Sequence, residues 1–282
     1  VRPGMNGLER AFQAAGAAAW GGVAYERLLP YMSAEARDRA EDLCPRPRTV
    51  LAAAFPYYAG DRPGNLSLYA RGEDYHRVLI RRLNTVCKFL SKIYPEELFC
   101  PSADNSPLPE REAAWLAGLG LRGKNGLFLL PPYGSYVFLG TILTGACLPL
   151  PEAAPAPDCM DCGKCAAACP VGILHTGKAK SGRCLSDITQ RKGALSAEEE
   201  ALLAAHPLIW GCDLCQRACP YNAAPALSPL PEFRDNLIDT LSGADLEGLT
   251  NRTFREKYGD RSFAWRGPAV LRRNLNLYPK GE

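Results

Sequence analysis

Eight cysteines between Cys159 and Cys219 are the residues whose types and spacing most clearly predict chemistry in this chain. The first group reads Cys-x2-Cys-x2-Cys-x3-Cys-Pro and the second Cys-x2-Cys-x3-Cys-Pro, with one further cysteine between the two groups. Thiolates two residues apart on a tight turn can each reach one corner of a [4Fe–4S] cubane, and the cysteine before proline ligates the other cluster. The pattern therefore predicts two clusters with crossed ligation and a role in moving electrons.

Each cluster is expected to take cysteines from both halves of the pattern. Cluster one would be held by Cys159, Cys162, Cys165 and Cys219, and cluster two by Cys169, Cys184, Cys212 and Cys215. Four thiolates also suit zinc, so a pair of zinc sites is the alternative. The Cys-Pro pair that ends each group and the repeated x2 spacing favour iron–sulfur clusters. The cysteines outside the pattern are expected to be ordinary thiols, and these are Cys44, Cys87, Cys100 and Cys147.

Composition and hydropathy exclude several classes of protein. Secreted disulfide frameworks are small domains with little core, whereas this chain has 282 residues, is 47% hydrophobic and gathers its cysteines at metal-ligand spacing. No run reaches the roughly 18 apolar residues of a membrane helix, since prolines and glycines interrupt the best candidate, residues 127–150. The amino terminus shows no basic region followed by an apolar stretch. We therefore expect a cytoplasmic protein without membrane association.

Two further signals carry less chemical information. Residues 118–125 (GLGLRGKN) nearly match a P-loop, but Asn125 stands where a P-loop needs Ser or Thr, and a helix precedes the motif instead of a strand. We expect a glycine-rich loop that allows close backbone approach to some ligand. Residues 251–282 carry eight Lys or Arg against three Asp or Glu. This stretch is either a solvated surface or a patch that faces nucleic-acid phosphates.

A mixture of helices and strands must position these residues. Apolar spacing predicts helices over 8–19, 34–43, 75–94, 107–119, 187–205, 230–241 and 269–277. Short apolar runs predict buried strands over 49–55 and 136–144. A Pro/Ala-rich linker over 148–158 predicts a domain boundary. Because the strands and helices do not strictly alternate, an α+β fold is expected for the first part of the chain.

Several segments, in order along the chain, resemble the epoxyqueuosine reductase family, whose members use cobalamin and iron–sulfur clusters in queuosine-tRNA maturation. Residues 43–57 look like the family's first core strand, and residues 69–79 (YARGEDYHRVL) are close to its Tyr-Ala-Arg-Gly-x-Asp-Tyr-His signature. Residues 103–112 (ADNSPLPERE) are similar to its Val-Asp-Thr-x-Pro-Leu-x-Glu-Arg stretch, with a departure at Asn105. Residues 118–140 resemble its Gly-Lys-Asn loop and following strand, and both cysteine groups follow its pattern.

The resemblance implies a corrinoid site in the amino-terminal domain. An acid beside the cobalt would protonate the departing epoxide oxygen. By carry-over that acid is Asp104, and we expect burial to raise its pKa toward neutrality. The residues expected to bind cobalamin are Tyr69, Arg71, Tyr75, His76, Gly123, Lys124, Asn125, Tyr133, Ser135, Tyr136 and Val137.

The resemblance also implies the domain organisation. Residues 1–150 would form a corrinoid-binding α/β domain on a nitroreductase-like sheet, giving an α+β chain. Residues 151–225 would form a bacterial two-cluster ferredoxin-like domain, and residues 226–282 a helical tail that packs back on the core. Longer family members carry a carboxy-terminal helical-repeat domain that helps to hold tRNA. This chain ends before one could form, so we expect a short form.

The predicted activity is an oxidoreductase that reduces epoxyqueuosine in tRNA to queuosine with two [4Fe–4S] clusters and cobalamin. Its expected partners are tRNA and an external electron donor such as ferredoxin or flavodoxin, and it is expected to be a monomer. One alternative is a corrinoid iron–sulfur reductase of a small molecule, similar to reductive dehalogenases. The other is a pure ferredoxin-type electron-transfer protein, which a cobalamin spectrum would separate from both enzymes.

Overall fold

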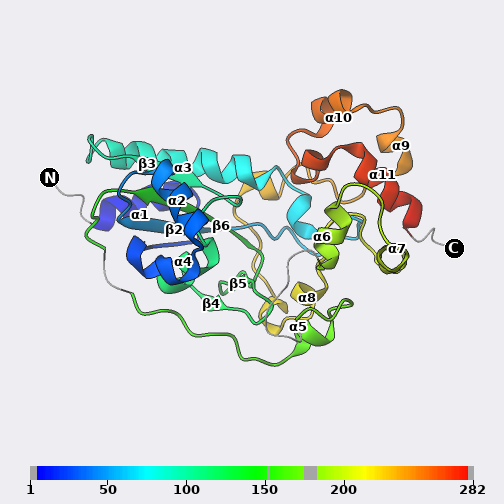
Figure 1. Ribbon diagram of the computed structural model, residues 1–282, viewed down its shortest axis with the longest axis horizontal. Helices are drawn as coiled ribbons and strands as arrows, with labels where there is room; N and C mark the ends of the chain where they lie inside the picture. The colour runs from blue at the N-terminus through cyan, green and yellow to red at the C-terminus, as the bar shows by residue number, and fades with distance from the viewer. Residues whose placement is uncertain (1–4, 151–152, 175–182, 279–282) are drawn as a thin grey trace.

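The computed structural model describes residues 5–150, 153–174 and 183–278 (Figure 1). Its central element is a four-stranded antiparallel sheet with the strand order β1–β2–β6–β3. These strands are β1 (Ala19–Ala24), β2 (Thr49–Pro56), β3 (Phe99–Ser102) and β6 (Val137–Thr144). A separate ribbon pairs β4 (Leu121–Arg122) with β5 (Phe128–Leu129). The predicted α+β class is confirmed.

Helices cover the sheet and make up most of the rest of the chain. Before the cysteines they are α1 (Met5–Ala14), η1 (Tyr25–Tyr31), α2 (Ala34–Leu43), η2 (Leu68–Ala70), α3 (Tyr75–Ser91) and α4 (Glu110–Leu116). The cysteine-rich part contains α5 (Lys164–Ala167), α6 (Leu185–Gln190), α7 (Ala197–Ala204), α8 (Leu214–Arg217) and η3 (Pro220–Asn222). The remainder contains η4 (Pro231–Phe233), α9 (Gly243–Leu246), α10 (Asn251–Tyr258), η5 (Ser262–Arg266) and α11 (Pro268–Leu277). None of these described helices has the length and apolar character that crossing a bilayer requires.

Strand β2 is buried along its whole length because helices cover both faces of the sheet. Leu51 and Phe55 belong to a core shared with α1 and α3, whereas Val50 and Ala54 belong to a second core shared with α2 and α4. Side chains alternate between the two faces along a strand, so a doubly covered strand must be apolar at every position. This is why the uninterrupted run over 49–55 identifies the strand from sequence.

Two strands of the sheet, β1 and β3, are not predicted by the sequence. Strand β1 (AWGGVA) contains two glycines, which disfavour strands, and it follows directly on an Ala-rich helical pattern. A Cβ at Gly22 would lie 1.9 Å from a methyl carbon of Leu150, so the glycine is needed for close packing. The predicted helix over 8–19 is therefore wrong at its end, because α1 stops at Ala14 and Ala19 begins β1.

Two other predicted helices also differ from the structure. The helix over 187–205 is interrupted between α6 and α7, where Gly193 has φ 84° and Ser196 forms a capping box with Glu199. The prediction of a helix over 230–241 is wrong, since only the short turn η4 forms there. Leu230 belongs to the core beside the sheet and Leu241 to the carboxy-terminal core, so this segment connects two cores instead of packing one face.

The carboxy-terminal helices pack on a core of their own, which reaches the first part of the chain. The Ser67 amide donates to the Trp210 carbonyl at 2.9 Å, and the Ile209 amide donates to the Asn65 carbonyl at 2.7 Å. Leu66 and Trp210 are both fully buried in this core with residues of α10 and α11. These bonds place the second cysteine group beside the segment that leads into α3.

Candidate functional site

The eight cysteines divide between two pockets. Cys159, Cys162, Cys165 and Cys219 line the outer pocket, and Cys169, Cys184, Cys212 and Cys215 line a wall of a larger cavity. Burial raises the pKa of the Cys219 thiol, and so do the charges of Cys162, Cys165 and Cys159. These two groups are the two ligand sets that crossed ligation predicts, while the ligation itself stays a prediction.

Two short helices carry this arrangement. Helices α5 and α8 each hold a cysteine of one motif, Cys165 and Cys215, and they contact one another. Gly163 precedes α5 with φ 73°, a conformation that glycine adopts without strain and that lets the chain turn sharply between Cys162 and Cys165. Four thiols per pocket form a donor set that suits a [4Fe–4S] cluster.

The glycine-rich loop forms a wall of the outer pocket. The Lys124 amide donates to the Cys159 sulfur at 3.3 Å, and the Cys159 amide donates to the Arg122 carbonyl at 3.0 Å. A Cβ at Gly123 would lie 2.8 Å from the Leu127 carbonyl oxygen, so glycine is needed for the turn itself. The close backbone approach expected of this loop is made to the first cysteine group.

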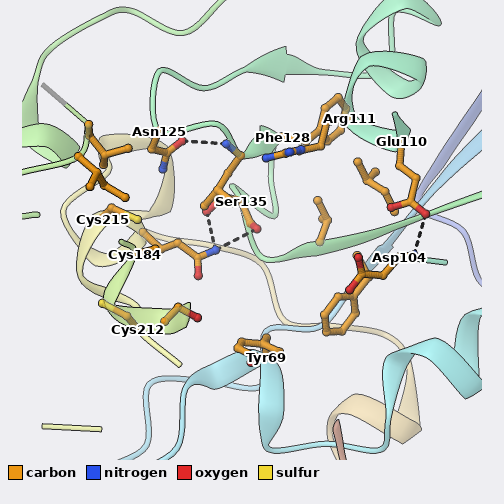
Figure 2. Close-up of a pocket in the computed structure, with 18 of the residues that line it drawn as sticks. Tyr69, Asp104, Glu110, Arg111, Asn125, Phe128, Ser135, Cys184, Cys212 and Cys215 are labelled. Atoms are coloured by element: carbon orange, nitrogen blue, oxygen red, sulfur yellow. Dashed lines mark hydrogen bonds between the residues drawn. The ribbon is translucent and has the colours of Figure 1, made fainter. Parts of the chain in front are cut away.

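The larger cavity has a volume of about 860 Å³, at the upper end of the range for cofactor sites. Figure 2 shows Cys184, Cys212 and Cys215 on one side of it and Asp104 and Glu110 on the other. Aromatic rings contribute much of the remaining wall, including Tyr57, Tyr69, Tyr75, Phe128 and Phe138. The cavity therefore joins a redox-capable thiol group to an acidic group across a largely apolar space.

Asp104 lies in a tight loop at the acidic end of the cavity. Asp104 and Asn105 have φ angles of 53° and 44°, in the left-handed region that few non-glycine residues occupy. Asp104 Oδ2 accepts a hydrogen bond from the Tyr75 hydroxyl at 2.6 Å and lies 3.3 Å from His76 Nε2. His76 Nδ1 in turn lies 2.7 Å from Asp74 Oδ1. These contacts hold the Asp104 carboxylate toward the cavity.

The predicted charge state of Asp104 is wrong. Its side chain is 53% exposed, and the hydrogen bond from His76, with that from Tyr75, holds its pKa below the ordinary range. Burial alone would lower the pKa of His76, but its hydrogen bonds to Asp104 and Asp74 raise it to about 9. At neutral pH the shared proton therefore resides on His76 and Asp104 is ionised.

Comparison with known proteins places this site in a family. Residues 37–103 match the model described as epoxyqueuosine reductase QueG, DUF1730, and residues 158–222 match the 4Fe-4S double cluster binding domain. An epoxyqueuosine reductase of Lactococcus garvieae is 32% identical over 268 residues, covering 89% of this chain and 71% of the relative. One of Synechocystis is 30% identical over 266 residues, covering 90% and 91%. The chain belongs to the epoxyqueuosine reductase family. The prediction of iron–sulfur cluster binding is likewise confirmed.

Solved structures of epoxyqueuosine reductases share the fold. One that holds an epoxyqueuosine-modified tRNA-Tyr stem loop is 29% identical, with a TM-score of 0.83, and covers 96% of this chain and 80% of that chain. A Bacillus cereus epoxyqueuosine reductase is 33% identical over 261 residues, covering 86% of this chain and 66% of the relative. This chain thus spans just under two thirds of the length of this relative and of three others, from Listeria monocytogenes, Bacillus anthracis and Bacillus subtilis.

The residues expected to bind cobalamin in this epoxyqueuosine reductase family member fall into two sets. Those that line the large cavity are Tyr69, Tyr75, Asn125, Ser135 and Val137. Those that do not are Arg71, His76, Gly123, Lys124, Tyr133 and Tyr136. His76 contacts the cavity residues Asp104 and Tyr75, and the glycine loop contributes Asn125.

Three residues of the second set belong to the framework of the fold. Buried Arg71 donates to the Leu66 carbonyl at 2.9 Å and pairs with Asp239 at 3.1 Å, which ties the carboxy-terminal part to the chain before α3. Tyr136 is buried with its ring stacked on Tyr58, and Tyr133 packs against the core beside α4. These contacts give the three residues a packing role, and their predicted contact with cobalamin stays a prediction.

Glu110 and Gln216 are among the cavity residues that sequence reasoning misses. Glu110 lies inside the family-like stretch over 103–112, but an acid at a helix start has a simpler explanation in the helix dipole. Gln216, between two cysteines, donates to the Ser135 hydroxyl at 3.1 Å and to Tyr57 at 3.3 Å. These bonds join α8 to the wall of the cavity, and no local pattern signals them.

One side-chain amide in the cavity wall, that of Asn125, bears on whether the cavity suits a corrinoid. Asn125 Oδ1 accepts from the Leu127 amide at 3.2 Å, whereas the buried Asn125 Nδ2 has no hydrogen-bond partner among the described residues. A buried unpaired donor is costly, so a ligand acceptor at this place would satisfy it. The amide side chains at the corrin edge provide such acceptors. The volume, the aromatic walls and this donor fit the group.

Proposed function

We propose that this chain reduces epoxyqueuosine in tRNA to queuosine, with cobalamin in the large cavity and two [4Fe–4S] clusters beside it. One observation carries the proposal. Four of the eight cysteines line one end of the large cavity, and Asp104 lines the other end (Figure 2). Family membership supports it, as does the relative solved with an epoxyqueuosine-modified stem loop. A relative from Bacillus subtilis has been solved with an aspartate-bearing catalytic loop swung out of the active site, which supports a catalytic role for the Asp104 loop.

The corrinoid would be held by residues that line the cavity. Asn125 would donate its free amide hydrogens, and Tyr69, Tyr75 and Val137 would contact the macrocycle. A bound corrinoid would supply the strongly nucleophilic metal centre that opening an epoxide requires. The protein contributes position, and its apolar walls exclude water from the reacting atoms.

Electrons would enter through the outer pocket. Cys162 is exposed and the side chain of Met160 beside it is 59% exposed, so a partner protein can approach this pocket. The second cysteine group lines the cavity, and α8, which holds Cys215, contacts α5, which holds Cys165 of the first group. Two clusters at these places would supply electrons one at a time, which a two-electron reduction needs.

Protons would be delivered by the pair of His76 and Asp104. His76 holds the proton at neutral pH, and Asp74 orients its ring through Nδ1. Asp104 accepts from both His76 and Tyr75, and it lines the cavity. In this arrangement Asp104 passes the His76 proton to the departing oxygen.

The tRNA would meet basic residues of the carboxy-terminal part. Helix α10 exposes Arg252, Arg255 and Lys257 to solvent, as a phosphate-binding face requires. Arg252 pairs with the exposed Glu256 at 3.0 Å, a contact that phosphate can displace because surface pairs are weak.

Anaerobic reconstitution with iron, sulfide and cobalamin, followed by an assay on epoxyqueuosine tRNA, tests the proposal. We expect corrinoid absorption at one equivalent per chain and conversion to queuosine with a low-potential donor. Intact clusters without corrinoid absorption would contradict the proposal and favour an electron-transfer protein. Corrinoid binding without any conversion of the tRNA would point to a different substrate.

A further inference from the structure

A second carboxyl group, that of Glu110, faces the cavity beside Asp104. Glu110 is the first residue of α4, and its Oε1 accepts a hydrogen bond from the Asp104 backbone amide at 2.7 Å. Figure 2 shows both side chains on the same side of the cavity, opposite the cysteines. No role in the proton transfer described above falls to Glu110.

The surroundings of Glu110 favour its neutral form. Burial, and then the charge of Asp104, raise its pKa, while the Asp104 amide and the charges of Arg111 and His76 oppose the rise, and the result is about 7. Arg111 acts on Glu110 through its charge, while its Nη1 donates to the Gly126 carbonyl. Glu110 can therefore take up and release a proton near neutral pH.

The chemistry of the proposed reaction needs two protons. Converting an epoxide to an alkene breaks both carbon–oxygen bonds, consumes two electrons and two protons, and releases the oxygen as water. The electrons come from the external donor through the clusters. His76 and Asp104 share one proton between them, so the reaction needs a second proton donor.

We propose that Glu110 is this second proton donor. Its carboxyl transfers a proton to the oxygen that leaves the substrate, becomes a carboxylate, and regains a proton from solvent before the next turnover. The inference rests on the function proposed above. Its position one hydrogen bond from the Asp104 backbone puts both donors on the same side of the substrate.

Infrared titration of the reconstituted protein tests the proton-holding role without any substrate. We expect the wild type to show a carboxylic acid band that disappears with a midpoint near pH 7. Glu110→Gln should lack this band and keep the bond to the Asp104 amide, since Gln retains an acceptor oxygen. Glu35→Gln, at an exposed acid in the first turn of α2, is the matched control and should keep the band. In Asp104→Asn the midpoint should move to lower pH, because a negative charge beside Glu110 is removed. A wild type without this band, or a Glu110→Gln variant that retains it, would overturn the proposal.

The pH profile of turnover tests the catalytic role. A general acid acts when protonated, so wild-type turnover should fall as the pH rises through about 7. Glu110→Gln should turn over about 10²- to 10⁴-fold more slowly, lose this limb of the profile, and keep its KM and its cluster and corrinoid content. Wild-type turnover and profile in Glu110→Gln would contradict the inference. Failure of the wild type on epoxyqueuosine tRNA would instead contradict the proposed function, with the infrared result still deciding whether Glu110 holds the proton.

Discussion

The cysteine end and the acidic end of the cavity are built in different ways. The cysteines sit on turns and on two four-residue helices, and their arrangement depends on short spacings within each motif. The acidic residues come from the start of α3, a strained loop and the start of α4, which only the sheet and its helices bring together. Short sequence spacings thus identify the cysteines that would ligate the clusters. The protonation of Asp104, His76 and Glu110 depends instead on burial and on neighbours from separate elements.

Replacing a single cysteine should have the largest effect at the cysteine end. Cys169→Ala removes a thiol that lies in the first motif but lines the cavity with Cys184, Cys212 and Cys215. We expect loss of about four of about eight irons, those of cluster two, and loss of all turnover. Iron analysis with Mössbauer spectra would measure this, with Cys147→Ala, an exposed thiol outside both pockets, as the control. Loss of cluster one with cluster two intact would contradict crossed ligation.

At the acidic end, Asp104→Asn should lower turnover by about 10²- to 10⁴-fold, because Asn cannot pass on the His76 proton. Cluster and corrinoid content should stay unchanged, since the cysteines lie on the opposite side of the cavity. Single-turnover kinetics on epoxyqueuosine tRNA would measure the effect. Asp38→Asn, at an exposed position of α2, should behave as wild type. Wild-type turnover in a fully loaded Asp104→Asn variant would remove Asp104 from the mechanism.

A matched pair of glycine substitutions tests whether the glycine-rich loop supports the outer cysteine pocket or the corrinoid site. Gly123→Ala would put a Cβ 2.8 Å from the Leu127 carbonyl oxygen, whereas Gly243→Ala meets no atom within 4 Å. We expect Gly123→Ala to lower the iron content of the outer pocket, with at most about four irons lost. Corrinoid binding should weaken as well, because the added Cβ would also lie 2.5 Å from Asn125 Oδ1. Iron analysis and visible spectra would separate the two effects. Full iron with lost corrinoid absorption would instead place Gly123 at the corrinoid.

The smallest expected effect is a change in the pKa of His76. Asp74→Asn keeps the helix cap, since Asn caps as well as Asp, but removes one carboxylate beside the imidazole. We expect the pKa of His76 to fall from about 9 by about one pH unit. In the folded chain the protonated form is favoured, so its stabilising contribution is complete below the ordinary pKa of 6.5 and is lost as the pH rises through about 9.

Imidazole resonances in proton NMR would follow this titration. His206, whose pKa burial lowers and which lies in the carboxy-terminal half of the chain, should titrate identically in wild type and variant. An unchanged His76 pKa in Asp74→Asn would show that Asp104 alone holds the imidazolium. Asp104→Asn would then have to produce the whole fall.

Local patterns in the sequence determined much of this protein. The cysteine groups, the buried run of β2 and the helices α2, α3 and α11 follow from spacings of a few residues, and each agrees with the structure. The family motifs likewise placed Asp104 at the cavity. These features depend on residue type and short-range periodicity, which the chain carries before it folds.

Only the tertiary structure decided the pairing of β1 and β3, the place of the glycine loop and the charges of the acidic end. Strand β1 forms because its backbone pairs with the edge of β2 and because Leu150 packs in the space beside Gly22. Asp104 is ionised because His76 lies 3.3 Å away, and the pKa of Glu110 is raised to about 7 because the carboxyl is half-buried beside that charge. Strand pairing and pKa values depend on atoms a few ångströms away in space but many residues away in sequence, and no local pattern records them.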